Sequence, residues 1–223
     1  MAKTGFLDIP PELRCIIYSL LLDADCDLEV FSAPQYGKTS QPIKLEMACR
    51  GQLSPSILRV NKEIHKEAAP ILYGGNVFRS EYGGQLTAFV QRIGDSAQHL
   101  RNIGYKKHEF KKDLRALLKA LKPANQLSFL SLPIELLAQE RYLATYSPRS
   151  LADQLAPFLR ALQRQQRKET DKKARDLTEV VHLNIDGVPW ISKERSQAWK
   201  ARAEANEKVL KGLIAEKLAL VKA

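Results

Sequence analysis

The sequence predicts a mixed, helix-rich α/β fold, with an N-terminal helical unit, a small, partly parallel sheet flanked by helices, and a long C-terminal helix. Two observations predict the sheet: short apolar runs recur along the chain, and segments with helical periodicity separate them. A third observation predicts the last helix, because residues 193–223 lack proline and are rich in Ala, Lys, Glu and Leu. With 44% hydrophobic and 27% charged residues, the chain of 223 residues has enough apolar surface to form a globular core.

The first predicted helix follows Asp8, which is a suitable N-cap. Pro10 and Pro11 suit a first helical turn, and Glu12 lies where the helix dipole favours an anion. Residues 13–22 are apolar on more than one side. We therefore expect this helix to be mostly buried or held against a partner.

The stretch between residues 23 and 54 is irregular, and its three alternating aspartates indicate a solvated acidic turn. Residues 28–31 predict a short strand, and residues 43–47 predict a second extended segment. These two segments form either a β-hairpin or a loop that becomes ordered on binding.

A second long helix is predicted from Ser54, with Pro55 at its first position. Apolar residues at three-and-four spacing give it one buried face, Pro70 is expected to kink or divide it, and glycines 74 and 75 end it. A short strand over 76–80 and an amphipathic helix over 86–93, closed by a glycine, follow.

The remaining chain alternates between strand and helix signals. The sequence predicts strands over 100–105, 127–132 and 180–185, and helices over 113–121 and 150–175. The helix over 193–223 packs on the body or projects toward a partner. We expect three segments: an N-terminal unit with an inserted hairpin or loop (1–80), an α/β body (81–192) and the C-terminal helix (193–223).

Cysteine content and the N-terminus bear on the compartment. The three cysteines at 15, 26 and 49 are too few for a disulfide framework, and the first residues lack the apolar run of a secretory signal. No stretch approaches the roughly 18 apolar residues of a membrane span. We therefore expect a cytoplasmic or nuclear protein without a membrane partner.

The search for catalytic motifs finds none. The sequence contains no phosphate-binding loop, no dinucleotide-binding glycine pattern, no nucleophile elbow and no zinc-protease pair. The four histidines are scattered, and His65 is read as a helix residue among solvated carboxylates. We expect a protein that is not an enzyme, with no cofactor, no metal and no small-molecule substrate.

Positive charge is concentrated in the second half. Residues 1–100 carry 10 Lys and Arg against 11 Asp and Glu, whereas residues 101–223 carry 25 against 14. Two basic runs are candidate sites for an acidic protein or nucleic acid, or are solvated helix faces. The candidates are Lys106, Lys107, Lys111, Lys112, Arg160, Arg164, Arg167, Lys168, Lys172 and Lys173.

Two segments together resemble a known family. Residues 6–22 read FLDIPPELRCIIYSLLL, which resembles the opening helix of F-box and F-box-like proteins with its Leu-Pro-x-Glu-Leu pattern. Residues 57–78 read ILRVNKEIHKEAAPILYGGNVF, which is similar to the second signature segment of a large family of fungal F-box-like proteins, most of them without an assigned function. The two motifs cover about the first third of the chain.

The resemblance implies an adaptor. F-box proteins insert their first helices into the Skp1 subunit of a cullin–RING ubiquitin ligase and present a client through their C-terminal part. On this resemblance the Skp1-facing residues are Ile9, Pro10, Leu13, Ile16, Ile17 and Val60. Residues 101–223 then bind the client, and their positive balance favours an acidic one.

Three other possibilities stay open. Both motifs can form only an internal helical core with no role in ubiquitin ligation. The basic runs can bind nucleic acid or a ribonucleoprotein. The chain can also be a scaffold subunit of a larger complex, assembled through its C-terminal helix.

Overall fold

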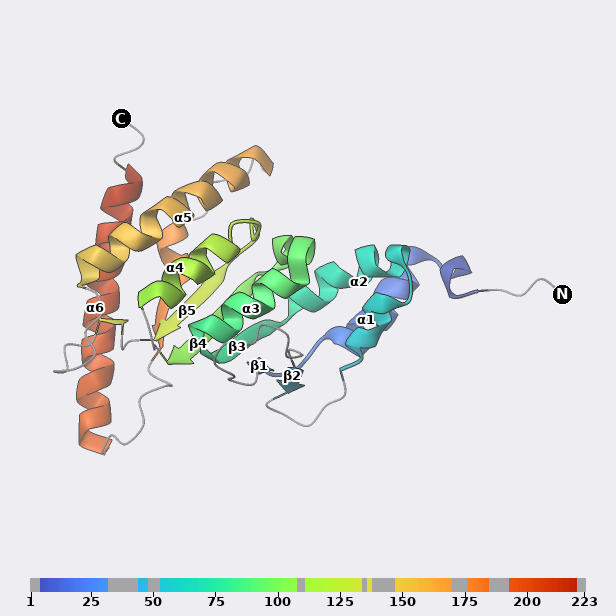
Figure 1. The fold of residues 1–223 in the computed structure, drawn as a ribbon, viewed down its shortest axis with the longest axis horizontal. Helices are drawn as coiled ribbons and strands as arrows, with labels where there is room; N and C mark the ends of the chain where they lie inside the picture. The colour runs from blue at the N-terminus through green and yellow to red at the C-terminus, as the bar shows by residue number, and fades with distance from the viewer. Residues whose placement is uncertain are drawn as a thin grey trace.

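The computed structural model describes residues 5–31, 44–47, 53–107, 111–133, 136–137, 147–169, 176–184 and 193–219. Only the backbone is described for 44–47, 111–112, 166–169, 193–200 and 202–203. The mixed α/β class and the partly parallel sheet flanked by helices are confirmed (Figure 1).

Six strands form one sheet in the order β2-β1-β3-β4-β5-β6. All neighbours pair in parallel except β1 and β2, which are antiparallel. The bounds are β1 Leu28–Phe31, β2 Lys44–Met47, β3 Val77–Tyr82, β4 Asn102–Lys107, β5 Phe129–Pro133 and β6 Val181–Asn184. Of the two predictions for residues 28–47, the paired hairpin strands are therefore confirmed.

The α-helices are α1 Pro11–Leu22, α2 Lys62–Gly75, α3 Gly83–Ile93, α4 Lys111–Ala120, α5 Pro148–Glu169 and α6 Lys193–Ala219. Short 3-10 helices are η1 Phe6–Asp8, η2 Pro55–Arg59, η3 Gly94–His99 and η5 Leu177–Val180. Because the parallel strands follow one another in chain order, crossovers of one hand place their helices on one face of the sheet. Figure 1 shows α3 and α4 covering that face.

The core lies between this face and the helices. Phe78, Ile103, Leu130 and Val181 occupy one level of four neighbouring strands, and each is at most 1% exposed. The buried apolar side chains run from α1 to α6 as one continuous cluster.

The predicted boundary between the first two segments, after residue 80, falls inside β3. β1 and β3 belong to the same sheet as β4, β5 and β6.

Two helix starts differ from the prediction. α1 begins at Pro11, and Asp8 belongs to η1, where its carboxylate accepts a hydrogen bond from the Gly5 N–H at 2.6 Å. The helix predicted from Ser54 is divided into η2 and α2, because the Asn61 side chain accepts from the Ile64 N–H at 2.8 Å and caps a new helix. α2 then continues through Pro70 to Gly75 without a division.

The described part of α6 packs on the body at the far end of the molecule from α1 (Figure 1). Leu210, Ile214 and Leu218 are buried against α5 and the sheet. The Glu207 carboxylate accepts from the Leu183 N–H of β6 at 3.3 Å, and the Arg160 guanidinium donates to the Lys217 carbonyl at 2.9 Å. Helix α6 therefore covers the open edge of the sheet at β6.

Among the described helices, none combines the length and the apolar composition that a membrane span requires.

Candidate docking site on the first helix

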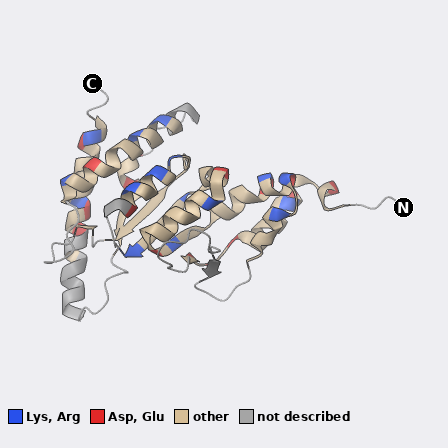
Figure 2. Cartoon of the chain, viewed as in Figure 1, with Lys and Arg blue, Asp and Glu red and all other residues tan. Residues whose placement is uncertain are grey.

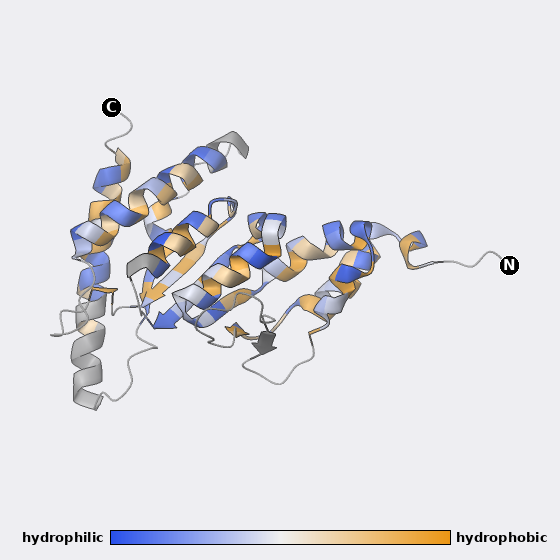
Figure 3. Ribbon diagram, viewed as in Figure 1, coloured by the Kyte–Doolittle hydropathy of each residue, from blue (hydrophilic) through white to orange (hydrophobic). Residues whose placement is uncertain are grey.

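Helix α1 contains many apolar residues (Figure 3), and they lie on two opposite sides of the helix. On the inner side, Tyr18 and Leu22 are fully buried. On the outer side, Leu13, Ile16 and Leu20 are 51%, 57% and 79% exposed. Their three-and-four spacing places these three side chains on one face of the helix. We call Leu13, Ile16 and Leu20 the outer face of α1.

An ionic network around the buried Arg14 anchors the N-terminal half of α1. Arg14 is 4% exposed; its Nε donates to Glu67 Oε2 of α2 at 3.0 Å, and its Nη2 donates to Glu67 Oε1. The remaining nitrogen, Nη1, donates to the carbonyls of Leu7 at 2.7 Å and Ile9 at 2.9 Å. The Tyr18 hydroxyl donates to Glu67 Oε2 at 2.9 Å. One carboxylate of α2 thus holds two side chains of α1.

The pKa values follow from these contacts. The hydrogen bond from Arg14 lowers the pKa of Glu67, against the opposing effect of burial, and the bond from Tyr18 lowers it further. The same Glu67 contact raises the pKa of Arg14. Burial, and then the hydrogen bond to Glu67, raise the pKa of Tyr18 to about 12. At neutral pH the network therefore holds an ionised Glu67, a charged Arg14 and a neutral Tyr18.

The side chain of Asn76 anchors the C-terminal end of α1. Its Nδ2 donates to the carbonyls of Leu22 and Leu72, both at 2.8 Å, and its Oδ1 accepts from the Ala24 N–H at 2.7 Å. Asn76 is 2% exposed, so these bonds are shielded from water. Anchored at both ends, α1 cannot turn its outer face inward without breaking buried hydrogen bonds.

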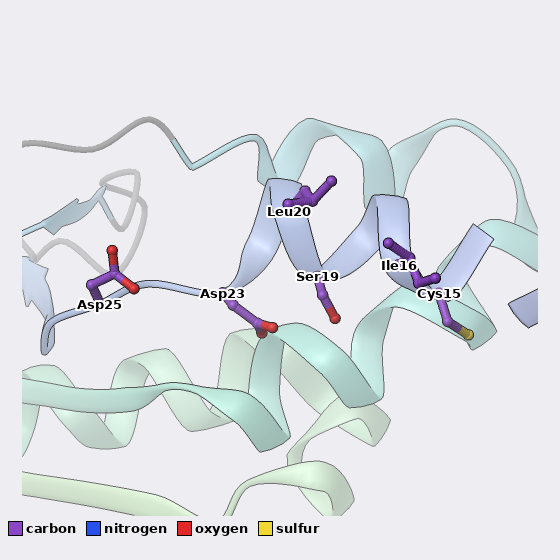
Figure 4. A pocket seen from close by; sticks show the side chains of 6 residues that line it. All are labelled: Cys15, Ile16, Ser19, Leu20, Asp23 and Asp25. Carbon is purple, nitrogen blue, oxygen red and sulfur yellow. The ribbon is translucent and has the colours of Figure 1, made fainter. Parts of the chain in front are cut away.

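An open hollow of about 560 Å³ lies beside the outer face. It is lined by Cys15, Ile16, Ser19, Leu20, Asp23 and Asp25. Figure 4 shows the last two of these on the chain that follows the final turn of α1. Cys15 is free and exposed here, whereas Cys26 is disulfide-bonded; Cys49 lies outside the described residues.

The structure separates the six residues expected to contact Skp1 into three groups. Leu13 and Ile16 lie together on the outer face, and Pro10 is exposed just before it. Ile9 and Ile17 are partly buried. Val60 is 65% exposed, but it lies on another element, at the C-cap of η2.

Leu20 was missed as a site residue although it is the most exposed of the outer face. Its position seven residues after Leu13 and four after Ile16 was the signal that could have found it. The polar residues Glu67, Asn76 and His65 of the second motif make contacts within the protein. His65 lies 3.0 Å from the Leu58 carbonyl through Nδ1 and 3.2 Å from Ser96 Oγ through Nε2.

The four basic candidates with described side chains lie on two elements, β4 and α5, and Figure 2 shows the basic residues of the described chain. Three of the four already have partners. Lys106 pairs with Glu29 of β1, and Lys107 pairs with Glu81 of β3. Arg160 donates to the end of α6, as described above, and Arg164 is exposed. The side chains of Lys111, Lys112, Arg167 and Lys168, and the residues Lys172 and Lys173, lie outside what is described. Within the described residues, no three His, Cys, Asp or Glu side chains are grouped to hold a metal ion.

The fold and this site define a class of protein: a mixed α/β body with an anchored helix that presents an apolar outer face. No protein-family model, no curated protein and no solved structure matches this chain.

Proposed function

We propose that this chain is a non-enzymatic adaptor that docks through helix α1 onto a Skp1-type subunit of a ubiquitin ligase and presents a protein client with residues 101–223. The observation that carries the proposal is the exposure of Leu13, Ile16 and Leu20 on a helix whose opposite side is fixed by Arg14 and Asn76. An apolar helix face held toward solvent favours a partner that covers it.

Burial of the three outer-face side chains by a partner would contribute measurably to the binding free energy. Moving a Leu or Ile side chain from full exposure to full burial contributes about 1.5–3 kcal/mol. With the three side chains between half and four-fifths exposed, covering them contributes about 3–6 kcal/mol. Together with Pro10 beside them, they form a small apolar patch of the kind that dominates binding energy in protein interfaces.

The resemblance to F-box-like proteins supplies the identity of the partner. The first motif contributes both the outer face and the buried Arg14, and the second contributes Glu67 and Asn76, which hold the first in place. The two segments therefore act as one unit in which the second orients the first. This arrangement supports a docking role for the pair and accounts for the buried positions of Arg14 and Asn76.

The test is a binding measurement between the purified full-length chain and Skp1, by calorimetry or surface plasmon resonance. We expect submicromolar binding by the wild-type protein and a loss of about a hundredfold for Ile16→Asp/Leu20→Asp. Val209→Asp is the matched control, because Val209 is 52% exposed on α6 at the other end of the molecule. Circular dichroism should show the same fold for all three proteins. Absence of binding by folded wild-type protein would contradict the proposal.

The other two candidate functions have less support. Nucleic-acid binding needs free cations, and Lys106 and Lys107 are already paired with carboxylates. Assembly through the C-terminal helix needs an open apolar face, and Leu210, Ile214 and Leu218 of α6 are buried in the body. An acidic client remains the proposal for the basic second half, because charge complementarity guides association.

A further inference from the structure

Two carboxylates beside the outer face of α1 have no charged partner among the described residues. Asp23 and Asp25 are exposed and line the hollow next to Ile16 and Leu20 (Figure 4). Asp27, two residues further on, pairs with Arg79 at 2.7 Å. In the part of the chain that the structure describes, neither Asp23 nor Asp25 forms an ion pair.

The backbone around these carboxylates is also negative. Asp23 is the C-cap of α1, and a Cβ added to Gly75, the last residue of α2, would lie 2.7 Å from Asp23 Oδ1. The carbonyls of Leu22 and Leu72 share the Asn76 amide, so the C-terminal ends of the two helices converge. A helix C-terminus carries about half a negative charge and disfavours an adjacent carboxylate.

The two helix dipoles therefore disfavour acids at this position. Arg101 lies beside Gly74 at the end of α2, and its guanidinium donates to Gln126 Oε1 at 3.4 Å. Two helix C-termini and two carboxylates that have no charged partner among the described residues thus place negative charge beside an exposed apolar face. Such a combination is complementary to a segment that is apolar on one side and basic next to it.

We propose that the segment that docks on α1 is a basic amphipathic helix: its apolar residues cover Leu13, Ile16 and Leu20, and its Lys or Arg reaches Asp23 and Asp25. This inference rests on the proposed function, since it uses the same docking face. The span fits a helix: at 1.5 Å per residue, Leu13 and Leu20 lie about 10 Å apart along α1, and Asp23 follows about one turn later. A partner helix needs its basic residue one turn beyond its apolar ones.

The experiment uses two synthetic helical peptides as probes with the full-length chain, measured by fluorescence anisotropy. Both carry three leucines at three-and-four spacing; they differ only in two Lys or two Glu residues one turn beyond. We expect the Lys peptide to bind about tenfold more tightly at low ionic strength and to lose this preference at high ionic strength. Asp23→Asn/Asp25→Asn should abolish the preference. Asp95→Asn/Glu204→Gln, which removes two exposed carboxylates elsewhere, should retain it.

The outcomes separate this inference from the proposed function. Equal binding of the two peptides, or no binding of either, overturns the inference. Skp1 binding by the wild-type chain together with equal peptide binding overturns the inference alone. A third outcome is that the chain prefers the Lys peptide, loses this preference in Ile16→Asp/Leu20→Asp, and does not bind Skp1. This outcome supports the inference and removes Skp1 as the partner.

Discussion

Arg14 and Glu67 are 53 positions apart in the sequence, yet the Arg14 guanidinium donates two hydrogen bonds to the Glu67 carboxylate, one of them at 3.0 Å. Because Nη1 also donates to the Leu7 and Ile9 carbonyls, this pair ties the turn before α1, α1 itself and α2 together. The outward direction of Leu13 and Ile16 depends on this contact.

Glu67→Gln should destabilise the fold, because a buried guanidinium then loses its counter-charge while the shape of the site is preserved. We expect the thermal unfolding midpoint to fall by several degrees, as measured by circular dichroism. Glu63→Gln is the matched control, since its side chain is 60% exposed and lies 3.8 Å from the same guanidinium. Equal midpoints for the two variants and the wild type would show that the network does not stabilise the fold.

Acid should remove the contribution of Glu67 to the free energy of unfolding. Its pKa is lowered in the folded state, so the unfolded state takes up the proton first as the pH falls. The contribution is therefore fully present above the ordinary pKa of 4.5 and is lost as the pH falls below it, through the lowered folded pKa. We expect the difference in unfolding free energy between wild type and Glu67→Gln to be constant above that value and to shrink below it. A difference that grows on acidification would contradict the assignment.

Asn76→Ala should cost about 3 kcal/mol of unfolding free energy, because three buried hydrogen bonds are lost and two carbonyls and one N–H are left without this partner. Denaturant unfolding measures the change. Asn76→Asp keeps the acceptor for the Ala24 N–H but not the donors to Leu22 and Leu72. We expect it to be destabilised as well, and wild-type stability in either variant would contradict this role for Asn76.

Gly104→Ala should destabilise the sheet by about 1–3 kcal/mol through overpacking. A Cβ at Gly104 would lie 2.5 Å from Ser131 Cβ and 3.0 Å from the Ser131 carbonyl oxygen on the neighbouring strand. Gly212→Ala is the control: nothing lies within 4 Å of its added Cβ, and in the interior of α6 it should stabilise by about 0.5–1 kcal/mol. The same sign for both substitutions in denaturant unfolding would contradict the close approach of β4 and β5. Ser131→Gly should partly rescue Gly104→Ala.

The positions of most strands and helices were predictable because they depend on local sequence patterns. The apolar runs that predicted strands over 76–80, 100–105, 127–132 and 180–185 correspond to β3 to β6 within a few residues. The helix over 86–93 ends at Gly94, whose φ of 55° favours glycine, as the sequence indicated. The cap of α2 was missed, because both Ser54 and Asn61 are acceptable caps and only the packed structure selects the second.

The site was predictable only in part. Apolarity on two sides of residues 13–22 predicted a helix that is buried or held against a partner, but periodicity cannot say which side faces the core. The pairing of Lys106 with Glu29, 77 positions away, was equally hidden, because register across three strands brings these residues together. Its place in a basic run made Lys106 a candidate for binding, whereas in the structure it pairs with the Glu29 carboxylate on the sheet.

The sequence by itself determined the α/β class, the positions of most strands and helices, and the two segments that build the first helical unit, because each of these depends on neighbours within a few residues. The tertiary structure decided which side of α1 is anchored and, within the described part of the chain, which carboxylates stay unpaired. Those outcomes depend on contacts such as Arg14 with Glu67 and Asn76 with Leu22, which join residues more than 50 positions apart. Only a packed core sets such distances, and they are what turn the apolar residues Leu13, Ile16 and Leu20 toward solvent.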